Sequence, residues 1–195
     1  MTVDRAWHID HNEPPGFTHI KLYHSDLFVD PFDLTVDNIR LEDIAHSLAH
    51  TCRFGGHVAT FYSVAEHSIA VARQALRLTG DLELAAAALL HDAAEAYLGD
   101  IPGPIKHRPE MAAWREAEAR ATETIAARFG LVRWDDPLIA ELDRSVLAWE
   151  MAMYRDGHNR ATPDHEGLCN AFQRGFHAID SRRTHTTTTP EEPTQ

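Results

Sequence analysis

The amino-acid sequence predicts an all-α fold, preceded by a short irregular or β-hairpin segment. Apolar residues recur at intervals of three and four over most of the chain, which is the spacing of amphipathic helices. Serine, aspartate and proline precede these stretches and glycine follows them, as is typical of helix ends. Runs of alternating apolar and polar residues are too short to seed a central sheet. The chain is therefore expected to be a helical bundle.

One domain is expected over 37–180, because 195 residues suit a single hydrophobic core. Residues 1–36 are rich in proline, glycine and aspartate, and two β-prone pieces, His19–Tyr23 and Leu27–Val29, favour a hairpin there. Residues 181–195 contain too few apolar side chains to offset the entropy of ordering. We therefore expect them to form a disordered tail.

The first two expected helices are defined by their ends and by their apolar faces. Leu41–Cys52 has apolar residues at helical spacing and ends at the turn Arg53–Gly56. Ser63 followed by Glu66 predicts a capping box at the start of a second helix, which Gly80 stops. The inward face of this second helix is expected to contain Val64, Val71, Ala75 and Leu78.

The remaining helices follow from the same signals. The stretch 81–98 is apolar almost all round and predicts one continuous helix at the centre of the bundle. A charged, alanine-rich helix is expected over 109–130. Asp136 and Pro137 indicate the start of another helix, and 166–179 predicts the last one. The inward face of the helix that starts at Pro137 is expected to contain Leu138, Leu142, Val146, Trp149 and Met153.

Charge and composition exclude several classes of protein. The formal net charge of -12 argues against binding to duplex nucleic acid, which depends on many lysines and arginines, whereas a small phosphorylated ligand needs only a local basic pocket. The longest apolar run, Leu84–Leu90, is far shorter than a membrane span, and no basic segment followed by an apolar one marks the N-terminus. Cys52 and Cys169 lack the paired spacing of a disulfide framework or zinc site. We expect a cytoplasmic protein with reduced core thiols.

Four metal-capable side chains occupy positions where apolar residues are expected. His91 and Asp92 directly follow the longest apolar run, where an isolated charge would be costly. His67 falls on the inward face of its helix, and Asp143 follows the apolar stripe of another. A buried His-Asp pair satisfied by hydrogen bonds is the alternative for two of them, but a metal site explains all four together. Two imidazoles and two carboxylates suit one divalent ion, such as Zn, Mn, Co, Ni or Fe, with Mg as a further option.

Two more residues suit catalysis at such a site. Glu95 lies four residues after His91 and three after Asp92, so a helix places its carboxylate on the same face as these ligands. Alanines on both sides of Glu95 indicate burial, and we expect it to act as the general acid or base; an exposed glutamate at a helix end is the alternative. Arg53 precedes a Phe-Gly-Gly turn, where small residues let a ligand approach, and its guanidinium can bind phosphate.

These residues and the motifs around them resemble HD-domain phosphohydrolases. The resemblance covers roughly 39–153. Within the superfamily, the motifs resemble in particular the small nucleotide-cleaving branch, which includes YfbR-type 5'-deoxynucleotidases and phage dATP triphosphohydrolases. The motifs that carry it are Arg53–His57, Tyr62–His67, His91–Glu95 and Gly99–Lys106. The resemblance implies an HD-domain helical bundle whose metal ligands are His67, His91, Asp92 and Asp143.

The resemblance also implies roles around the metal. Glu95 would position the attacking water or protonate the leaving group. Lys106 would contact phosphate and Asp100 a sugar hydroxyl, although an exposed lysine and an ordinary turn are the alternatives. Phe54 stands where YfbR-type enzymes carry tryptophan, which leaves the sugar selectivity open. His57 is a secondary candidate for phosphate binding.

The expected function is metal-dependent hydrolysis of a (deoxy)nucleotide, with release of phosphate from nucleoside 5'-monophosphates. The first alternative is a triphosphohydrolase that releases tripolyphosphate from dNTPs, and the second is a non-catalytic nucleotide-sensing HD domain. Alarmone hydrolases fit less well, because they resemble His-Asp-x-x-Glu-Asp, whereas Ala96 follows Glu95 here. Cyclic-nucleotide phosphodiesterases need further histidine ligands that cannot be assigned. The expected partners are a small nucleotide and further copies of the chain.

Overall fold

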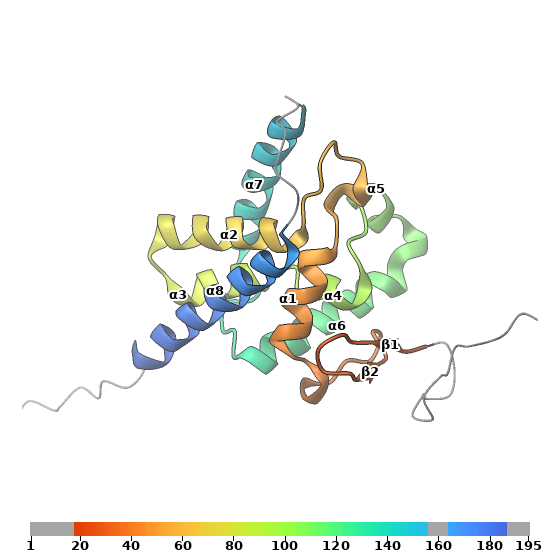
Figure 1. Cartoon of the computed structure of the whole chain (residues 1–195), viewed down its shortest axis with the longest axis horizontal. Helices are drawn as coiled ribbons and strands as arrows, with labels where there is room; N and C mark the ends of the chain where they lie inside the picture. Colours follow the sequence, from red (N-terminus) through yellow and green to blue (C-terminus); the bar gives the residue numbers. More distant parts are fainter. Residues whose placement is uncertain (1–17, 156–163, 187–195) are drawn as a thin grey trace, which may run out of the picture.

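The all-α expectation is confirmed by the computed structural model, which describes residues 18–155 and 164–186. The expected hairpin is also present, because β1 (Ile20–Lys21) pairs antiparallel with β2 (Phe28–Val29). The other elements drawn in Figure 1 are helices. The remaining parts of the expected N-terminal segment and tail, 1–17 and 187–195, lie outside the described residues.

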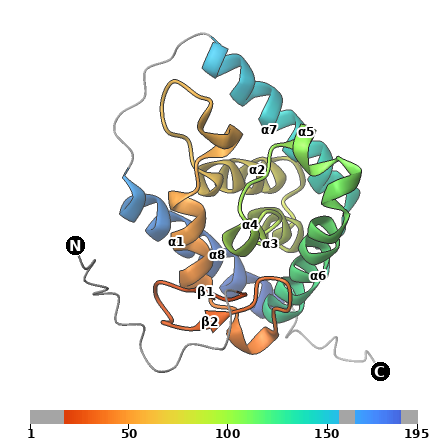
Figure 2. The same ribbon diagram turned by 90° about the vertical axis from the view of Figure 1, so that its right-hand side faces the viewer.

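The helices form one bundle with three helices at its centre. In chain order they are α1 (Leu41–His50), α2 (Val64–Thr79), α3 (Leu82–Leu89), α4 (Glu95–Leu98), α5 (Gly103–Lys106), α6 (Ala112–Phe129), α7 (Pro137–Arg155) and α8 (His165–Thr186). α2 packs against α3 and α7, and α8 packs against α1 and α3. Figure 2 shows α2, α3 and α4 in the middle of the molecule, with α1, α6, α7 and α8 around them.

The core is built mainly from alanine and branched apolar side chains. α3 lies at its centre, as its composition predicted, and every residue from Leu84 to Leu89 is buried. Ile44 of α1, Val71 of α2 and Phe172 of α8 are completely buried as well. Burying an aliphatic or phenylalanine side chain contributes roughly 1.5–3 kcal/mol each. The helices around α3 are thus held by one continuous apolar cluster.

The predicted helix caps are present at atomic detail. The Ser63 hydroxyl accepts a hydrogen bond from the backbone N–H of Glu66 at 3.1 Å, and the Glu66 carboxylate accepts one from the backbone N–H of Ser63 at 3.0 Å. Gly80 ends α2 in the left-handed region, with φ 68°, which glycine adopts without steric cost. Asp81 caps α3, since its carboxylate accepts from the N–H of Leu84 at 3.0 Å.

The continuous helix predicted over 81–98 is wrong, because the chain breaks between α3 and α4. In a continuous helix the carbonyl of Ala88 would accept the N–H of residue 92. Instead it accepts a hydrogen bond from Nδ1 of His91 at 2.8 Å. The following backbone bonds close tighter turns, such as Glu95 N–H to the Asp92 carbonyl at 3.0 Å. His91 and Asp92 therefore lie in a turn and not within a helix.

Two predicted apolar faces also need correction. Leu78, expected on the inward face of α2, is 57% exposed, and Trp149 of α7 is 54% exposed. The buried stripe of α7 runs instead through Ile139, Leu142, Val146 and Glu150. The stripe is rotated because spacing alone allows Trp149 or Glu150 to follow Val146, and the bundle places the carboxylate inward.

The last helix is longer than predicted. α8 continues to Thr186, so a disordered tail that starts at residue 181 is wrong for the described part of this segment. The cause is Arg183, which is 8% exposed although it belongs to a polar stretch. Its guanidinium donates to the carbonyls of Phe129 and Gly130 at the C-terminal end of α6 and contacts the Glu83 carboxylate at 3.0 Å. A cation at a helix C-terminus is stabilised by the exposed carbonyls.

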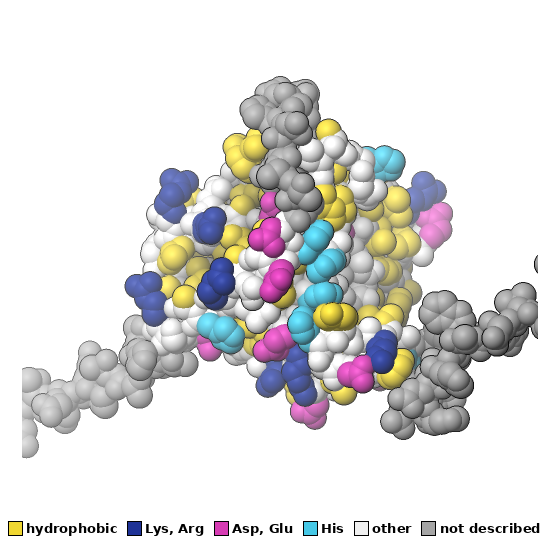
Figure 3. All heavy atoms as spheres, in the orientation of Figure 1, with side chains coloured by type: hydrophobic (Ala, Val, Ile, Leu, Met, Phe, Trp, Pro, Cys, Tyr) yellow, Lys and Arg dark blue, Asp and Glu magenta, His cyan; other side chains and the backbone are white. Residues whose placement is uncertain are grey.

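A row of aromatic rings crosses the surface where the hairpin loop, α1 and α8 meet. Tyr23 stacks on His46 with ring centres 4.2 Å apart, His46 lies 4.2 Å from His50, and His50 stacks on His165 at 4.5 Å. Figure 3 shows the histidine side chains gathered in a band on this face. We call Tyr23, His46, His50 and His165 the histidine row.

Two further expectations concern membranes and thiols. Within residues 18–155 and 164–186, no helix combines the length and hydropathy that a bilayer crossing requires. Both cysteines are free thiols, as predicted. Only Cys169 is a buried core thiol, however, because Cys52 is half-buried next to Arg53 at the end of α1.

Candidate metal centre

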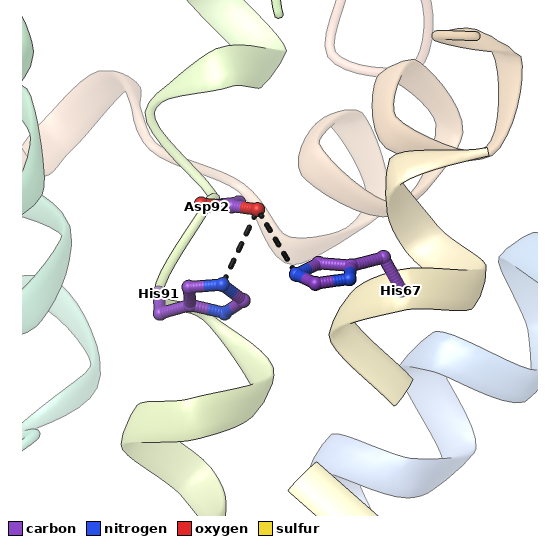
Figure 4. A group of neighbouring side chains, drawn as sticks. All are labelled: His67, His91 and Asp92. Atoms are coloured by element: carbon purple, nitrogen blue, oxygen red, sulfur yellow. Dashed lines mark ion pairs between the residues drawn. The ribbon is translucent and has the colours of Figure 1, made fainter. Parts of the chain in front are cut away.

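Three of the four predicted ligands lie close together, and we call these three, His67, His91 and Asp92, the metal group. His67 projects from α2 and is completely buried, and His91 and Asp92 come from the turn between α3 and α4. Their ligand atoms all lie within 4.8 Å of one another. The Asp92 Oδ2 atom is 3.2 Å from Nε2 of His91 and 3.7 Å from Nε2 of His67 (Figure 4). The break in the helix brings His91 and Asp92 to one side, which a regular helix would not do.

Asp143, the fourth predicted ligand, lies beside this group on α7. Its Oδ1 atom is 3.0 Å from Nε2 of His67, and its side chain is 37% exposed. α7 supplies it because α7 packs directly against α2. The two imidazoles and two carboxylates predicted from the sequence thus come together, with Asp143 on the solvent side.

The two imidazoles are oriented with Nε2 toward the centre. Nδ1 of His67 donates a hydrogen bond to Oε1 of Glu150 at 2.8 Å, and Nδ1 of His91 donates to the carbonyl of Ala88 at 2.8 Å. A proton on Nδ1 leaves Nε2 with a lone pair, which is the form that binds a metal ion. Within the described residues, neither buried Nε2 atom has a hydrogen-bond partner of suitable geometry. A metal ion would satisfy both atoms, so these residues fit a divalent cation.

The electrostatics of the group favour positive charge at its centre. Burial lowers the pKa of His67, but the carboxylates of Asp143 and Glu150 outweigh this effect and raise the pKa to about 9. Burial raises the pKa of Asp92, but His91, His67 and Arg53 more than compensate and hold that pKa well below its usual range. In the metal-free chain, the raised pKa of His67 therefore favours its protonated imidazole. Metal ions displace such protons when they bind.

Glu95 lies beside the metal group as the first residue of α4. It is 7% exposed, so the burial expected from the neighbouring alanines is confirmed. Burial raises the pKa of its carboxyl to about 10, and the negative charges of Asp92 and Asp100 act in the same direction. Its Oε2 atom is buried without a hydrogen-bond partner among the described residues. A carboxyl that holds its proton at neutral pH can serve as a general acid.

Arg53 lies between a residue of the metal group and a buried glutamate of α7. Its guanidinium is buried and contacts Asp92 at 3.5 Å and Glu150 at 3.4 Å. Phe54, the next residue, adopts a φ of 60°, and the guanidinium lies 5.4 Å from the centre of its ring. A Cβ added to Gly55 would lie 3.5 Å from the Pro102 side chain. The Arg53 turn is therefore packed against the loop between α4 and α5.

The other predicted site residues lie at different depths. Asp100 is half-buried, and burial raises the pKa of its carboxyl, whereas Arg53 and Lys106 oppose the shift. Lys106 donates to the Glu118 carboxylate at 2.5 Å, and its Nζ lies 5.1 Å from the centre of the Trp114 ring. The side chain of His57 is exposed. The structure thus brings Lys106 and Asp100 within electrostatic range of Glu95.

Sequence reasoning missed two residues of this site, Glu150 and Glu118. Glu150 of α7 is 1% exposed and accepts hydrogen bonds from both His67 and Tyr62. Glu118 of α6 holds Lys106, and burial raises the pKa of its carboxyl. Glu150 had only an ambiguous signal in the sequence, because helical spacing allows either Trp149 or Glu150 to follow Val146 on the apolar stripe. Glu118 had none, since it sits in a helix with many charged residues.

Comparison with known proteins identifies the family. The sequence pattern of the HD domain matches residues 64–169, just over half of the chain. The uncharacterized protein YfdR of Escherichia coli K12 is 39% identical over 114 residues, which cover 58% of this chain and 60% of that protein. An uncharacterized protein of Rhodobacter capsulatus is 39% identical over 107 residues, which cover 53% of this chain and 54% of that protein. The chain spans somewhat over half the length of these relatives, and it belongs to the HD domain family.

Proposed function

We propose that this chain is a metal-dependent phosphohydrolase that releases phosphate from nucleoside 5'-monophosphates, with deoxynucleotides preferred. The observation that carries the proposal is the convergence of His67, His91 and Asp92 beside the buried carboxyl of Glu95. HD family membership supports metal-dependent hydrolysis in general. The nucleotide substrate rests on the resemblance of the Arg53 turn and the α4–α5 loop to nucleotide-cleaving enzymes.

The proposed ligands of one divalent transition metal are His67, His91, Asp92 and Asp143. When bound, such an ion lowers the pKa of coordinated water and polarises a phosphoryl oxygen. The chain's own contribution begins with orientation, because the two Nδ1 contacts hold both imidazoles in the metal-binding form. Burial of both Nε2 atoms also keeps bulk water from competing for them.

The remaining residues handle protons and charge. Burial raises the pKa of the Glu95 carboxyl and so favours its protonated form, and we therefore assign it the protonation of the leaving oxygen of the sugar. Arg53 is assigned to the phosphate oxygens, whose negative charge its guanidinium can bind in bidentate fashion. Lys106 would join it after exchanging Glu118 for phosphate. Asp100 is assigned to a sugar hydroxyl.

The balance of charge favours one phosphate over three. Arg53 and Lys106, the two cations assigned to phosphate, already contact carboxylates. Carboxylates from Asp92, Asp100 and Glu118 line the same region. A monophosphate carries about two negative charges, so it meets less repulsion there than a triphosphate.

Product identification tests the proposal. Purified chain would be incubated with nucleoside monophosphates and triphosphates in the presence of Mn, Co or Zn, and the products separated. The proposal expects nucleoside and inorganic phosphate from monophosphates, more rapidly from deoxy substrates. Intact tripolyphosphate from dNTPs would establish the triphosphohydrolase alternative instead. Bound metal without cleavage of either class would favour a nucleotide-sensing domain.

A further inference from the structure

Glu150 occupies a position in α7 where the fold alone calls for an apolar side chain. It continues the buried stripe of Leu142 and Val146 and is 1% exposed. A buried carboxylate costs free energy unless its oxygens are paired. Packing against α2 therefore gives no reason for a glutamate at this place, whereas its contacts do.

The carboxylate of Glu150 joins three side chains from different segments. Its Oε1 atom accepts a hydrogen bond from the Tyr62 hydroxyl at 2.7 Å and another from Nδ1 of His67 at 2.8 Å. Its Oε2 atom lies 3.4 Å from the guanidinium of Arg53. Tyr62 is itself 2% exposed, so the hydroxyl and the carboxylate form a buried pair. The Nδ1 contact restricts rotation of the His67 ring, and the Tyr62 and Arg53 contacts hold the carboxylate that makes it.

We propose that Glu150, supported by Tyr62, is the positioning residue of the metal centre: it fixes the His67 ring with Nε2 toward the metal and couples that ring to the Arg53 guanidinium. A carboxylate that accepts a hydrogen bond from Nδ1–H of a metal-bound histidine fixes the tautomer of the histidine and makes Nε2 a stronger ligand. His91 obtains the same tautomer from a backbone carbonyl, which no side-chain substitution can remove. A substitution of Glu150 is thus expected to change the metal affinity through its effect on His67.

The coupling to Arg53 follows from the same geometry. One guanidinium nitrogen contacts the metal-group residue Asp92 and the other contacts Glu150. The guanidinium therefore spans a predicted ligand and the residue that orients another ligand. When Glu150 is changed, Arg53 loses a partner that holds it at the edge of the metal group. Substrate binding is then expected to weaken together with metal binding.

The test measures metal affinity, because the inference rests on the metal centre of the proposed function but not on its substrate. Co²⁺ or Zn²⁺ would be titrated into metal-free chain in competition with a chromophoric chelator. Glu150→Gln keeps the shape of the side chain and is expected to weaken metal binding about 10–100-fold. Glu141→Gln, on the exposed side of the same helix, is the matched control and should bind as the unaltered chain does.

A second variant keeps the inference testable if Glu150→Gln misfolds. Tyr62→Phe removes only the hydroxyl that supports Glu150, so the fold is retained and a smaller loss of affinity is expected. Metal affinity unchanged in both variants, with helical content and thermal unfolding preserved, would overturn the inference. If the unaltered chain itself bound no metal, the metal centre would fail instead, so the two failures are distinguishable.

Discussion

At the scale of single residues, His67 and His91 reach the same orientation by different means. His91 is held by the carbonyl of Ala88, and His67 by the carboxylate of Glu150. The first contact arises within four residues of chain, whereas the second joins α2 to α7. That His67, His91 and Asp92 lie close together was predictable from the sequence, because histidine and aspartate among apolar residues are conspicuous. The partner of His67 was not, because helical spacing does not fix the rotation of α7.

Removal of His91 tests the metal centre directly. We expect about one divalent ion per chain in protein prepared without chelator, since the four ligands suit one mononuclear site. His91→Ala removes one buried Nε2 and should lose this ion. Elemental analysis of both proteins checks it. Full occupancy in the variant would contradict the assignment of His91 as a ligand.

Glu95 is expected to matter for turnover and not for metal content. Glu95→Gln keeps the size of the side chain but removes the proton that the buried carboxyl would deliver. Turnover should fall about 10²–10⁴-fold, the range for loss of general acid catalysis. Steady-state rates and elemental analysis would be measured together, with the exposed Glu123→Gln as control. Activity equal to that of the control would remove Glu95 from the mechanism.

The raised pKa of His67 predicts how the stability of the metal-free chain depends on pH. Its folded pKa of about 9 lies above the unfolded value of about 6.5, so folding favours the protonated imidazole. The resulting stability is complete below the unfolded pKa and is lost as pH rises through the folded pKa. Thermal unfolding of metal-free protein should therefore shift to lower temperature between about pH 6 and pH 9.

Asp143→Asn provides the comparison for this pH dependence. It removes one of the three carboxylates that raise the pKa of His67, and its position is partly exposed. The slope of unfolding temperature against pH should be smaller in this variant. Identical slopes in the two metal-free proteins would show that His67 does not carry the effect.

At the scale of helices, local signals and long-range contacts explain which elements could be predicted. The start of α2 and the ends of α2 and α6 follow from serine, glutamate and glycine within a few residues of each boundary. The break between α3 and α4 could not be predicted from local signals, because the apolar pattern continues through it. At this break the side chain of His91, and not a backbone N–H, donates to the carbonyl of Ala88.

The cap of α3 can be tested by a single substitution. The Asp81 carboxylate accepts from the N–H of Leu84 and contacts Arg133. Asp81→Ala should lower the free energy of unfolding by about 1 kcal/mol, the usual loss for an N-cap. Denaturant unfolding would measure it, and Asp135→Ala, at an exposed position in the neighbouring loop, is the control. An effect no larger than that of the control would mean that the cap does not stabilise α3.

At the scale of the whole molecule, the fold explains why the site residues are scattered along the sequence. α2 and the turn after α3 supply the metal group, α7 supplies Asp143 beside it, and the three meet because α2 packs on both α3 and α7. The sequence predicted this meeting from burial, since each residue lay on an apolar face. The depth of Lys106 and its pairing with Glu118 depend on how α6 lies against the α4–α5 loop. The homo-oligomer stays a prediction.

The histidine row has a practical consequence for handling the protein. His46 and His50 stand one turn apart on α1, a spacing at which two imidazoles on a helix can chelate an ion, and His165 adjoins them. Untagged protein should therefore be retained on an immobilised-nickel column and elute with imidazole, and the double change His46→Ala and His50→Ala should make it elute earlier. Co-elution of the two proteins would show that the row does not chelate. Ions leached from such resin would inflate any elemental count, so preparations intended for stoichiometry should be purified by ion exchange.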